Sequence, residues 1–314
     1  APHIPAPGET VLGHGVQSFA GGKGANQAVA CARAGGAATT LLAALGNDDN
    51  AKPLLASLQS AGVALQHVPS TEPTGTAFIC VASGGENAIT VAPGANSTLA
   101  AAHWPQGLAL SHLLMQLETP LPTVLAFARA ARAQGAQVVL NAAPAQALPP
   151  ELLALVQVLV VNEGELATLA GPGAAAGVRE PATKVRETAS QVRATAQSVR
   201  QQLQALAAQH GIGSVIVTLG AAGCLALHNG QWLQQAAFKV DVQDTTGAGD
   251  TFCGALVAAL GRGDGMPRAL QEASAAAALA CTQLGAQSSI PTREAVLART
   301  GDEDPVDDGL DRPK

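Results

Sequence analysis

The chain lacks tyrosine, and aromatic residues make up only 2% of its 314 residues. Because 47% of the residues are nonetheless hydrophobic, the core must be packed from leucine, valine and alanine, and so many alanines favour closely packed helices. The sequence has no uninterrupted apolar run long enough to cross a bilayer and no visible signal peptide. We therefore expect a cytoplasmic protein that does not bind membranes.

Charged residues and cysteines are also few. Only 13% of the residues are charged, and the formal net charge is −6. This balance argues against a general nucleic-acid binder, which needs a basic face, but not against phosphate ligands, which local dipoles and single cations can hold. The five cysteines show no Cys-x-x-Cys spacing, so we expect reduced residues of a cytoplasmic protein. They are Cys31, Cys80, Cys224, Cys253 and Cys281.

Two glycine-rich loops, by contrast, have sequences that suggest a function. In the segment 244–254, DTTGAGDTFCG, two carboxylates bracket two glycines ahead of a run of small apolar residues. Glycines let the backbone present successive N–H groups, and a helix starting at Gly247 points its positive end at the same place. This arrangement favours an anion, with phosphate the best candidate. Asp250 could then take a proton from an attacking hydroxyl. The alternative is an ordinary turn with an N-cap.

The second loop, 21–30, has the sequence GGKGANQAVA. It is not a Walker A loop, because that pattern needs glycine at position 17 and serine or threonine at position 24, where the chain has Gln17 and Gly24. A pocket lined by Gly22 that offers Lys23 and Asn26 suits a small polyol, because ammonium and amide groups bond to hydroxyls. The alternative role for Asn26 is to cap the helix that begins there.

Apolar runs of strand length alternate with longer helix-like segments along the chain. This alternation is typical of a mostly parallel sheet with helical crossovers. Motifs begin directly after three of the runs, at Glu118, Asn162 and Gly220, which is where ligands bind in open α/β sheets. The expected strands are 39–44, 112–117, 137–141, 158–161 and 214–219, and the expected helices are 26–34, 50–61, 120–134, 251–260 and 267–284.

Three segments depart from this alternation. Residues 76–91 predict a β-hairpin with its turn at 83–86. Valine–arginine pairs recur every seven residues from Val185, which predicts an amphipathic helix within 184–208. That helix is either a lengthened surface helix or a contact helix for a second subunit. The tail 300–314, rich in Asp, Pro and Gly, is expected to be disordered.

Together, the motifs resemble the ribokinase branch of the PfkB sugar-kinase family, in order from Gly8 to Glu294. The resemblance implies a ribokinase-like three-layer α/β fold over 1–299, with a mostly parallel central sheet. It also implies a small β-strand lid, from about 7–16 and 74–93, that would exclude water from the sugar. The motifs that carry it are Pro7–Thr10, Gly21–Asn26, Leu114–Glu118, Asn162–Glu165, Thr218–Gly223, Asp244–Asp250 and Gly285–Ser289.

The implied activity is transfer of the γ-phosphoryl group of ATP to the O5 hydroxyl of D-ribose, giving ribose 5-phosphate. The implied partners are the sugar and ATP, and we expect a homodimer. Two alternatives stay open: a kinase of the family for another sugar, such as deoxyribose, and a truncated, inactive sugar-binding relative. A kinase of the family for a nucleoside is disfavoured, because a chain without tyrosine offers few aromatic side chains to stack on a nucleoside base.

The resemblance assigns roles to individual residues. Asp250 would be the catalytic base, and the backbone N–H groups of Gly247, Ala248 and Gly249 would stabilise the transferring phosphoryl group. The sugar would be bound by Gly22, Lys23, Asn26, Glu118 and Asp250. ATP would be bound by Asn162, Thr218, Leu219, Gly220, Ala221, Ala222, Gly223, Gly249 and Ser274.

The resemblance also implies two metal sites. Asn162 and Glu165 would hold Mg²⁺ through water, which suits an ion that sheds its hydration shell reluctantly. Their spacing fits an N-cap and its partner equally well, and Glu118 has the alternative of a solvated strand end. A monovalent cation, K⁺, would be held largely through carbonyl groups at Asp244, Thr246, Ala280, Gln283, Gly285 and Ser289.

One part of the family pattern is absent. The family begins with a buried strand whose aspartate grips sugar hydroxyls, and this sequence opens at the following loop with neither. A charged hydrogen bond is worth about 1.5–3 kcal/mol, so its loss would weaken sugar binding, and a missing strand would leave an unpaired sheet edge. We expect the sequence to be a fragment of a longer chain; the alternative is a weakened relative.

Overall fold

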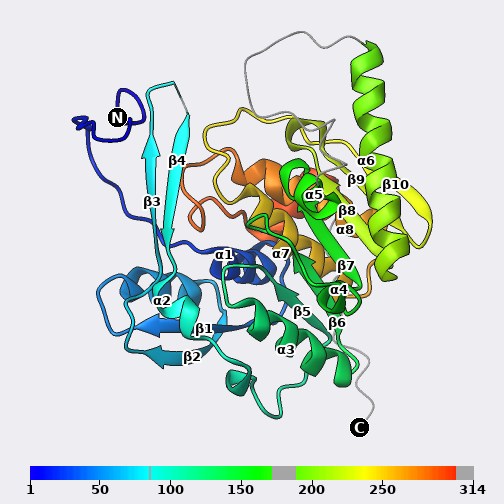
Figure 1. Ribbon diagram of the computed structural model, residues 1–314, viewed down its shortest axis with the longest axis horizontal. Helices are drawn as coiled ribbons and strands as arrows, with labels where there is room; N and C mark the ends of the chain where they lie inside the picture. The colour runs from blue at the N-terminus through cyan, green and yellow to red at the C-terminus, as the bar shows by residue number, and fades with distance from the viewer. Residues whose placement is uncertain (85, 172–188, 302–314) are drawn as a thin grey trace.

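The computed structural model describes residues 1–84, 86–171 and 189–301. Within them, the largest sheet has six strands in the order β10-β9-β8-β7-β6-β5 (Figure 1). Strands β5 to β8 run parallel, and β9 and β10 extend the sheet in antiparallel order, so the predicted mostly parallel sheet is confirmed. The strands are β5 (His112–Met115), β6 (Gln137–Asn141), β7 (Val158–Asn162), β8 (Ser214–Thr218), β9 (Cys224–His228) and β10 (Gln231–Gln235).

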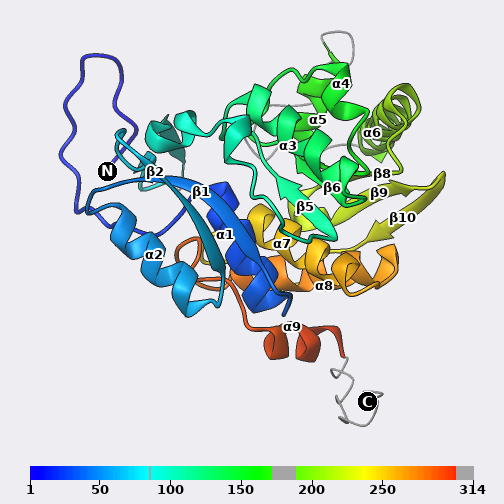
Figure 2. The ribbon, with the colours of Figure 1, turned by 90° about the horizontal axis from the view of Figure 1, so that it is seen from below.

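Helices cover both faces of this sheet, which gives three layers (Figure 2). Successive strand residues point to opposite faces, so Val139 and Val160 share one core with the first group of helices, while Leu140 and Leu159 share the other core with the second group. Burial on both faces explains why these strands are apolar throughout. The first group is α1 (Lys23–Val29), α7 (Ala248–Gly261) and α8 (Met266–Ala280), and the second is α3 (Leu121–Ala133), α4 (Pro150–Leu153), α5 (Glu163–Ala170) and α6 (Ala189–His210).

A separate small sheet pairs β1 (Thr40–Gly46) with β2 (Ala64–Ser70) in parallel, joined through α2 (Ala51–Ser60). The predicted strand 39–44 therefore forms, but outside the main sheet. Strands β2, β9 and β10 were not predicted. For β2 the reason is its half-exposed pattern, which lacks an apolar run. The remaining short elements are η2 (Gly94–Thr98), η3 (Ala101–His103), η5 (Gly220–Ala222) and α9 (Arg293–Thr300).

The predicted hairpin is confirmed. Strands β3 (Thr76–Val81) and β4 (Asn87–Ala92) pair in antiparallel register and project away from the small sheet (Figure 1). Residues 1–22 contain no helix or strand, and the amino group of Ala1 donates to the Val81 carbonyl at 2.8 Å. The N-terminal segment therefore contacts the hairpin near its tip. That the segments 7–16 and 74–93 act as a lid stays a prediction.

Three predicted helices differ from the observed bounds by more than one residue at an end. The helix expected over 26–34 begins three residues earlier, as α1, and its last part is the π-helical turn η1 (Ala30–Ala34). The helix expected from 251 begins at 248, as α7. The helix expected over 267–284 ends as α8 at Ala280, because the Thr282 hydroxyl and the Gln243 N–H bind the carbonyl groups of Leu279 and Cys281.

Helix α6 covers most of the predicted heptad segment. The side chains of Val199, Leu203 and Leu206 are buried in the core beneath it. The Arg200 guanidinium lies over Trp232, 4.7 Å from the ring centroid. This part of α6 packs on its own chain, as the surface-helix interpretation expects. The start of the segment, 184–188, and residues 302–314 of the predicted tail lie outside the described residues. Thr300, the first residue of that predicted disordered tail, is the last residue of the helix α9 instead.

In the ranges that the structure describes, none of the helices is both long enough and apolar enough to span a bilayer.

Candidate active site

Asp250 lies on the first turn of α7, with only 8% of its surface exposed. Gly247, the N-cap of α7, has a φ of 76°, in the left-handed region that favours glycine. A Cβ there would lie 3.2 Å from the Ala286 Cα, so the turn also needs the space. Turn, glycine and first-turn carboxylate are placed as the sequence predicts, at the positive end of a helix.

Two side-chain amides of α1 bind the Asp250 carboxylate. The Asn26 Nδ2 donates to Oδ2 at 2.8 Å, and the Gln27 Nε2 donates to Oδ1 at 2.9 Å. Burial raises the pKa of Asp250 above its ordinary value, although Lys23 and the two amides oppose the rise. A carboxylate with a raised pKa is a better proton acceptor than an exposed aspartate, which suits a general base.

Asn26 does not cap its helix. The N-cap of α1 is Gly22, which has a φ of 91° and no side chain, and Asn26 lies three residues after the start of the helix. The capping interpretation of Asn26 is therefore wrong. The Asn26 Oδ1 is buried and has no hydrogen-bond partner in the described part of the chain. A buried acceptor without a donor is unfavourable. A ligand hydroxyl would supply the missing donor.

Glu118 contacts the start of the same helix. Its Oε2 accepts the backbone N–H of Lys23, the first residue of α1, at 2.8 Å. Glu118 is half-buried, and burial raises its pKa, while the N–H and the charge of Lys23 lower it and the charge of Asp250 raises it. The interpretation of Glu118 as a solvated strand end is therefore wrong. Its predicted contact with the sugar stays a prediction.

A cavity of about 140 Å³ lies beside Asp250. It brings together residues from four separate motifs: Lys23 from α1, Asn162 and Glu165 from the β7–α5 junction, Thr218 from the end of β8, and Asp250 itself. Predicted site residues that are far apart in the sequence therefore line one space. The other lining residues are Asn141, Ala143, Val160, Val161, Gly247, Gly249 and Cys253.

Asn162 and Glu165 form a reciprocal cap at the N-terminus of α5. The Glu165 N–H donates to Asn162 Oδ1, and the Asn162 N–H donates to Glu165 Oε2, both at 2.8 Å. The capping interpretation is confirmed. Burial raises the pKa of Glu165, partly offset by the Asn162 N–H and by Lys23.

The cap does not conflict with the predicted Mg²⁺ site. It uses one carboxylate oxygen of Glu165, and the second oxygen is of the kind that binds hydrated Mg²⁺. In the ranges described, no group of three or more His, Cys, Asp or Glu side chains is arranged to hold a metal directly. Mg²⁺ at this place would therefore keep most of its waters, as the prediction of a water-mediated site requires.

The predicted nucleotide loop, 218–223, connects β8 to β9 through the exposed turn η5. Gly223 has a φ of 94°, and a Cβ there would lie 2.6 Å from the Ala237 nitrogen, so only glycine fits. The predicted ATP contact Ser274 is buried on α8, with its Oγ 4.0 Å from the Cys224 Sγ. Of Ser274 and the residues of loop 218–223, only Thr218 lines the cavity beside Asp250.

Asp244 joins the two loops predicted to hold K⁺. Its Oδ1 accepts the Thr246 N–H and its Oδ2 accepts the Gly285 N–H, both at 2.9 Å. Burial alone would raise the pKa of Asp244, but the hydrogen bonds from Thr246 and Gly285 outweigh burial and lower it. Three of the six predicted cation residues are therefore in direct contact.

The other three predicted cation residues lie at the end of α8 and in the loop after it. The Gln283 N–H donates to the Ala280 carbonyl at 3.4 Å, and the Ser289 hydroxyl donates to the Ala286 carbonyl at 2.9 Å. The Cys281 carbonyl accepts the N–H groups of residues 243 and 244, which places the end of α8 beside the Asp244 loop. The cation role of these residues stays a prediction.

The site also contains buried amides to which the sequence motifs assign no role. The Gln27 Nε2 donates to Asn141 Oδ1 at 3.0 Å as well as to Asp250, and the Gln27 Oε1 accepts from Gln116 Nε2. The sequence did contain a signal for Asn141. It is the polar residue at the end of a predicted strand, much as Asn162 is the polar residue that directly follows one.

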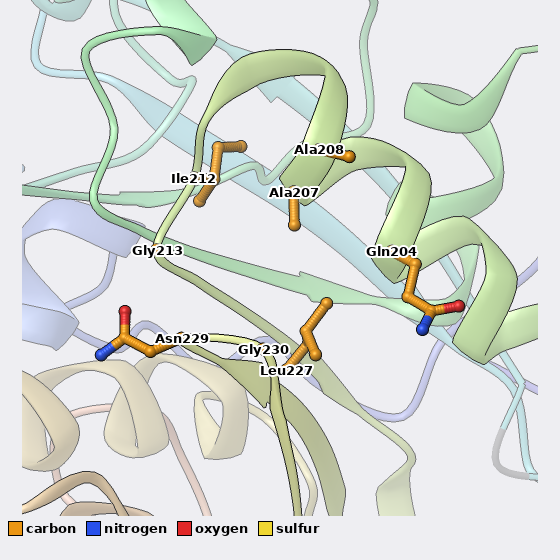
Figure 3. Close-up of a pocket in the computed structure, with 8 residues that line it drawn as sticks. All are labelled: Gln204, Ala207, Ala208, Ile212, Gly213, Leu227, Asn229 and Gly230. Carbon is orange, nitrogen blue, oxygen red and sulfur yellow. The ribbon is translucent and has the colours of Figure 1, made fainter.

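A larger hollow, of about 440 Å³, lies between the C-terminal part of α6 and the β9–β10 turn (Figure 3). No titratable side chain among the described residues lines it, whereas the smaller cavity beside Asp250 contains two carboxylates and a lysine. Perturbed carboxylates gathered in a cavity mark a candidate active site, so we place the chemistry at Asp250. The hollow is lined by Gln204, Ala207, Ala208, Ile212, Gly213, Leu227, Asn229 and Gly230.

The chain is similar to known proteins over nearly its whole length. The model of the pfkB family of carbohydrate kinases matches residues 2–293. The ribokinase of Haemophilus influenzae is 40% identical over 304 residues, which cover 94% of this chain and 92% of that protein. The ribokinase of Staphylococcus aureus is 34% identical over 302 residues, which cover 92% of this chain and 91% of that protein.

Solved structures agree with these sequence matches. The ribokinase of Thermotoga maritima superposes with a TM-score of 0.81 at 33% identity, covering 96% of this chain and 94% of that one. The ribokinase of Arabidopsis thaliana, complexed with ribose and ATP, superposes with a TM-score of 0.76 at 30% identity, covering 95% and 93%. The ribokinase-like fold expected from the motifs is thereby confirmed. On the family match and these relatives, the chain belongs to the pfkB family of carbohydrate kinases.

Proposed function

We propose that this chain uses ATP to phosphorylate D-ribose at its O5 hydroxyl, giving ribose 5-phosphate. The observation that carries the proposal is the buried carboxylate of Asp250, held at the N-terminus of α7 by Asn26, whose own buried oxygen lacks a donor. A proton acceptor, an amide that needs a hydroxyl and a helix N-terminus suit a hydroxyl that attacks a phosphoryl group. The names of the relatives support ribose and ATP as the substrates.

Asp250 accepts the proton of the attacking hydroxyl as the phosphorus–oxygen bond forms. Asn26 orients that carboxylate and accepts a sugar hydroxyl at Oδ1. Glu118, half-buried beside Lys23, accepts further hydroxyls, and Gly22 leaves room for the sugar to approach the backbone. Positioning of this kind supplies much of the rate in phosphoryl transfer.

The N-terminus of α7 stabilises the transferring phosphoryl group. Gly247 and Gly249 line the cavity, so their N–H groups are the first candidates. The Ala248 N–H donates to the Thr245 carbonyl at 3.2 Å and must leave that bond to take part. Losing one such donor costs on the order of 10²–10³ in rate.

The residues assigned to ATP and Mg²⁺ lie around the same cavity as Asp250. Asn162 and Thr218 line this cavity, and the glycine-rich turn that follows Thr218 would bind the nucleotide together with Ser274. These contacts extend through Leu219, Gly220, Ala221, Ala222, Gly223 and Gly249. Asn162 and Glu165 would hold Mg²⁺ through water, and the ion would supply positive charge to offset that of the phosphate oxygens.

K⁺ activates the enzyme from the loops joined by Asp244. The hydrogen bonds from Thr246 and Gly285 to one carboxylate bring these loops together behind Gly247. Carbonyl groups of these loops would hold the cation, and its charge would help to fix the turn that leads into α7.

We also assign the enzyme to the cytoplasm, because all five cysteines are free thiols.

We assign the exposed hairpin to a homodimer interface. Ile79 and Ile89 are directly opposed, so they share one face of the hairpin, with Val81 and Val91 next to them. Their exposed fractions are 49%, 56%, 53% and 53%. Apolar side chains gathered on one exposed surface mark an interaction site. A second copy of this chain offers the same apolar face in return.

The direct test is ATP-dependent phosphorylation of D-ribose by this chain and by Asp250→Asn. We expect loss of the base to lower kcat by roughly 10²–10⁴ with the KM for ATP unchanged. The matched control is Asp49→Asn, at an exposed aspartate that pairs only with Lys52 among the described residues, and it should keep full activity. An Asp250→Asn variant with more than about a tenth of normal activity would contradict the assignment.

The same assay decides the choice of sugar. D-ribose and 2-deoxy-D-ribose differ only at the 2-hydroxyl, so comparing their kcat/KM values measures what the enzyme gains from that group. We expect D-ribose to be preferred. A chain that binds ATP and turns over neither sugar would contradict the proposed function.

A further inference from the structure

Gln27 is deeply buried beside Asp250, with 1% of its surface exposed. Its Nε2 donates to Asp250 Oδ1 at 2.9 Å and to Asn141 Oδ1 at 3.0 Å, and its Oε1 accepts from Gln116 Nε2. Both N–H bonds and the carbonyl of the amide are therefore engaged by the protein. Unlike Asn26, Gln27 keeps no orphan atom that calls for a sugar hydroxyl.

These partners determine which way the amide points. If the amide were reversed, Oε1 would face two acceptor oxygens, of Asp250 and Asn141, and neither could donate to it. The Asn141 Nδ2 in turn donates to the Val160 carbonyl at 3.3 Å. The orientation of Gln27 is thus held by residues at the ends of β5 and β6 and, through Asn141, by the backbone of β7.

We propose that Gln27 is a positioning residue that sets the carboxylate plane of Asp250, with Gln116 and Asn141 fixing the direction of its amide. The proposal rests on the proposed role of Asp250 as the base. Asn26 and Gln27 are consecutive residues of one rigid helix, and each binds a different carboxylate oxygen. Two donors so placed stop the carboxylate from rotating, which keeps a lone pair aimed at the sugar hydroxyl.

Two glycines make the arrangement possible. A Cβ at Gly24 would lie 3.2 Å from Gln116 Oε1, so a larger residue there would press on the amide that binds Gln27. Gly254 lies on α7, four residues after Asp250, and a Cβ there would collide with the Gln27 carbonyl oxygen. The close approach of α1 to α7 therefore depends on Gly254, and only that approach lets Gln27 reach Asp250.

The proposal separates Gln27 from its neighbour Asn26 in kinetics. Gln27 has all its hydrogen bonds inside the protein, so its loss should lower kcat and leave the KM for ribose unchanged. It donates to the charged form of Asp250, so its loss should also move the acid limb of the kcat profile to higher pH. A purely structural role would change neither the position of that limb nor the balance of kcat and KM.

The test is Gln27→Glu, which keeps size and shape but replaces the donating NH₂ with a carboxylate oxygen. Two carboxylates in contact share one proton, so we expect kcat at neutral pH to fall about 10- to 100-fold, the range set by one charged hydrogen bond. The acid limb should move to higher pH. The position of a pH limb does not depend on the fraction of active enzyme, so partial misfolding would not hide it.

Gln202→Glu is the control, because Gln202 is also buried, at 6% exposure, but lies on α6 across the sheet. Its acid limb should coincide with that of the unaltered enzyme. A new carboxylate beside Asp250 would move the limb by its charge alone, so Gln116→Met is assayed in parallel: it removes the donor that orients Gln27 without adding a charge. It should move the limb in the same direction, and a Gln116→Met limb that stays in place would overturn the proposal.

A Gln27→Glu limb that coincides with that of the unaltered enzyme, or a loss confined to KM, overturns the proposal. Asp250→Asn, assayed in parallel, tests the base by itself. If that variant keeps more than about a tenth of the activity, it is the proposed function that fails, whatever Gln27→Glu does. The two failures are therefore distinguishable.

Discussion

Asn26 donates to Asp250 at 2.8 Å although 224 positions separate the two residues in the sequence. The bond joins the N-terminal turns of α1 and α7, and thus the loop assigned to the sugar and the loop assigned to the phosphoryl group. The same Asn26 side chain keeps a buried oxygen without a donor. One residue therefore orients the proposed base and contacts the proposed substrate.

Replacing Asn26 should weaken sugar binding as well as slow turnover. Asn26→Ala removes a donor to Asp250 and the acceptor for a sugar hydroxyl, so we expect kcat/KM for ribose to fall about 10- to 100-fold, through a raised KM together with a lowered kcat. Steady-state kinetics at saturating ATP measure the change, and the KM for ATP serves as the internal control. An unchanged KM for ribose would show that Asn26 does not touch the sugar.

The raised pKa of Asp250 predicts a pH-dependent contribution to stability. The folded protein binds the Asp250 proton more tightly than the unfolded chain, whose aspartates titrate near about 3.9, so this group's contribution falls as the pH rises through the raised folded pKa. Asp250→Asn removes that contribution. The free energy of unfolding of Asp250→Asn, relative to the unaltered protein, should therefore increase from pH 4 towards neutrality. Urea titrations at several pH values measure it, and parallel curves would contradict the prediction.

The proposed cation site predicts a dependence of rate on K⁺. Saturating rates should be higher in potassium than in sodium or choline buffers. Asp244→Asn replaces one acceptor oxygen with a donor, so it opposes the N–H of Thr246 or Gly285 and should raise the K⁺ concentration for half-activation about tenfold. Asp49→Asn is the control. Equal rates in all three buffers would remove the cation from the mechanism.

The proposed dimer interface predicts that a charge on the apolar face of the hairpin changes the oligomeric state of the protein. Ile89→Lys places a charge in the middle of the exposed apolar face of β3 and β4, so it should convert a dimer to a monomer in sedimentation experiments. Leu55→Lys is the matched control, because Leu55 is an exposed leucine, at 39%, on α2. A dimer that survives Ile89→Lys would place the interface elsewhere.

Replacing Glu272 should destabilise the fold strongly without a direct effect on catalysis. Its buried carboxylate, 2% exposed, binds Arg262 at 2.6 Å, Arg268 at 3.0 Å and Arg293 at 3.2 Å. Glu272→Ala leaves three arginines without their shared partner and should lower the free energy of unfolding by about 3–5 kcal/mol. Urea unfolding measures it. Asp264→Asn, at a more exposed partner of Arg262, should cost less than about 1 kcal/mol, and similar losses in both variants would contradict the prediction.

Much of the fold could be predicted from local patterns in the sequence. Strands such as β6 and β7 are short apolar runs bounded by polar residues, and helices such as α3 carry an apolar face, so both could be predicted. Strands β2 and β10 have no apolar run of their own and are held by pairing with neighbouring strands, and the alternation of side chains along β2 leaves most of them exposed. Strand β9 does contain a short buried apolar run, 224–227, so it could have been predicted and was missed.

The sequence by itself determined the loop–helix motifs, because a left-handed turn at Gly247 and a first-turn carboxylate at Asp250 are local properties of the chain. Only the tertiary structure decided which amides meet that carboxylate. Gln27 and Gln116 carry no local signal of their roles, and the strand end at Asn141 shows only that this residue lies near the site. A hydrogen bond between side chains depends on how α1, β5 and β6 are placed relative to α7. That placement is set by core packing, and above all by the close approach that Gly254 allows between α1 and α7.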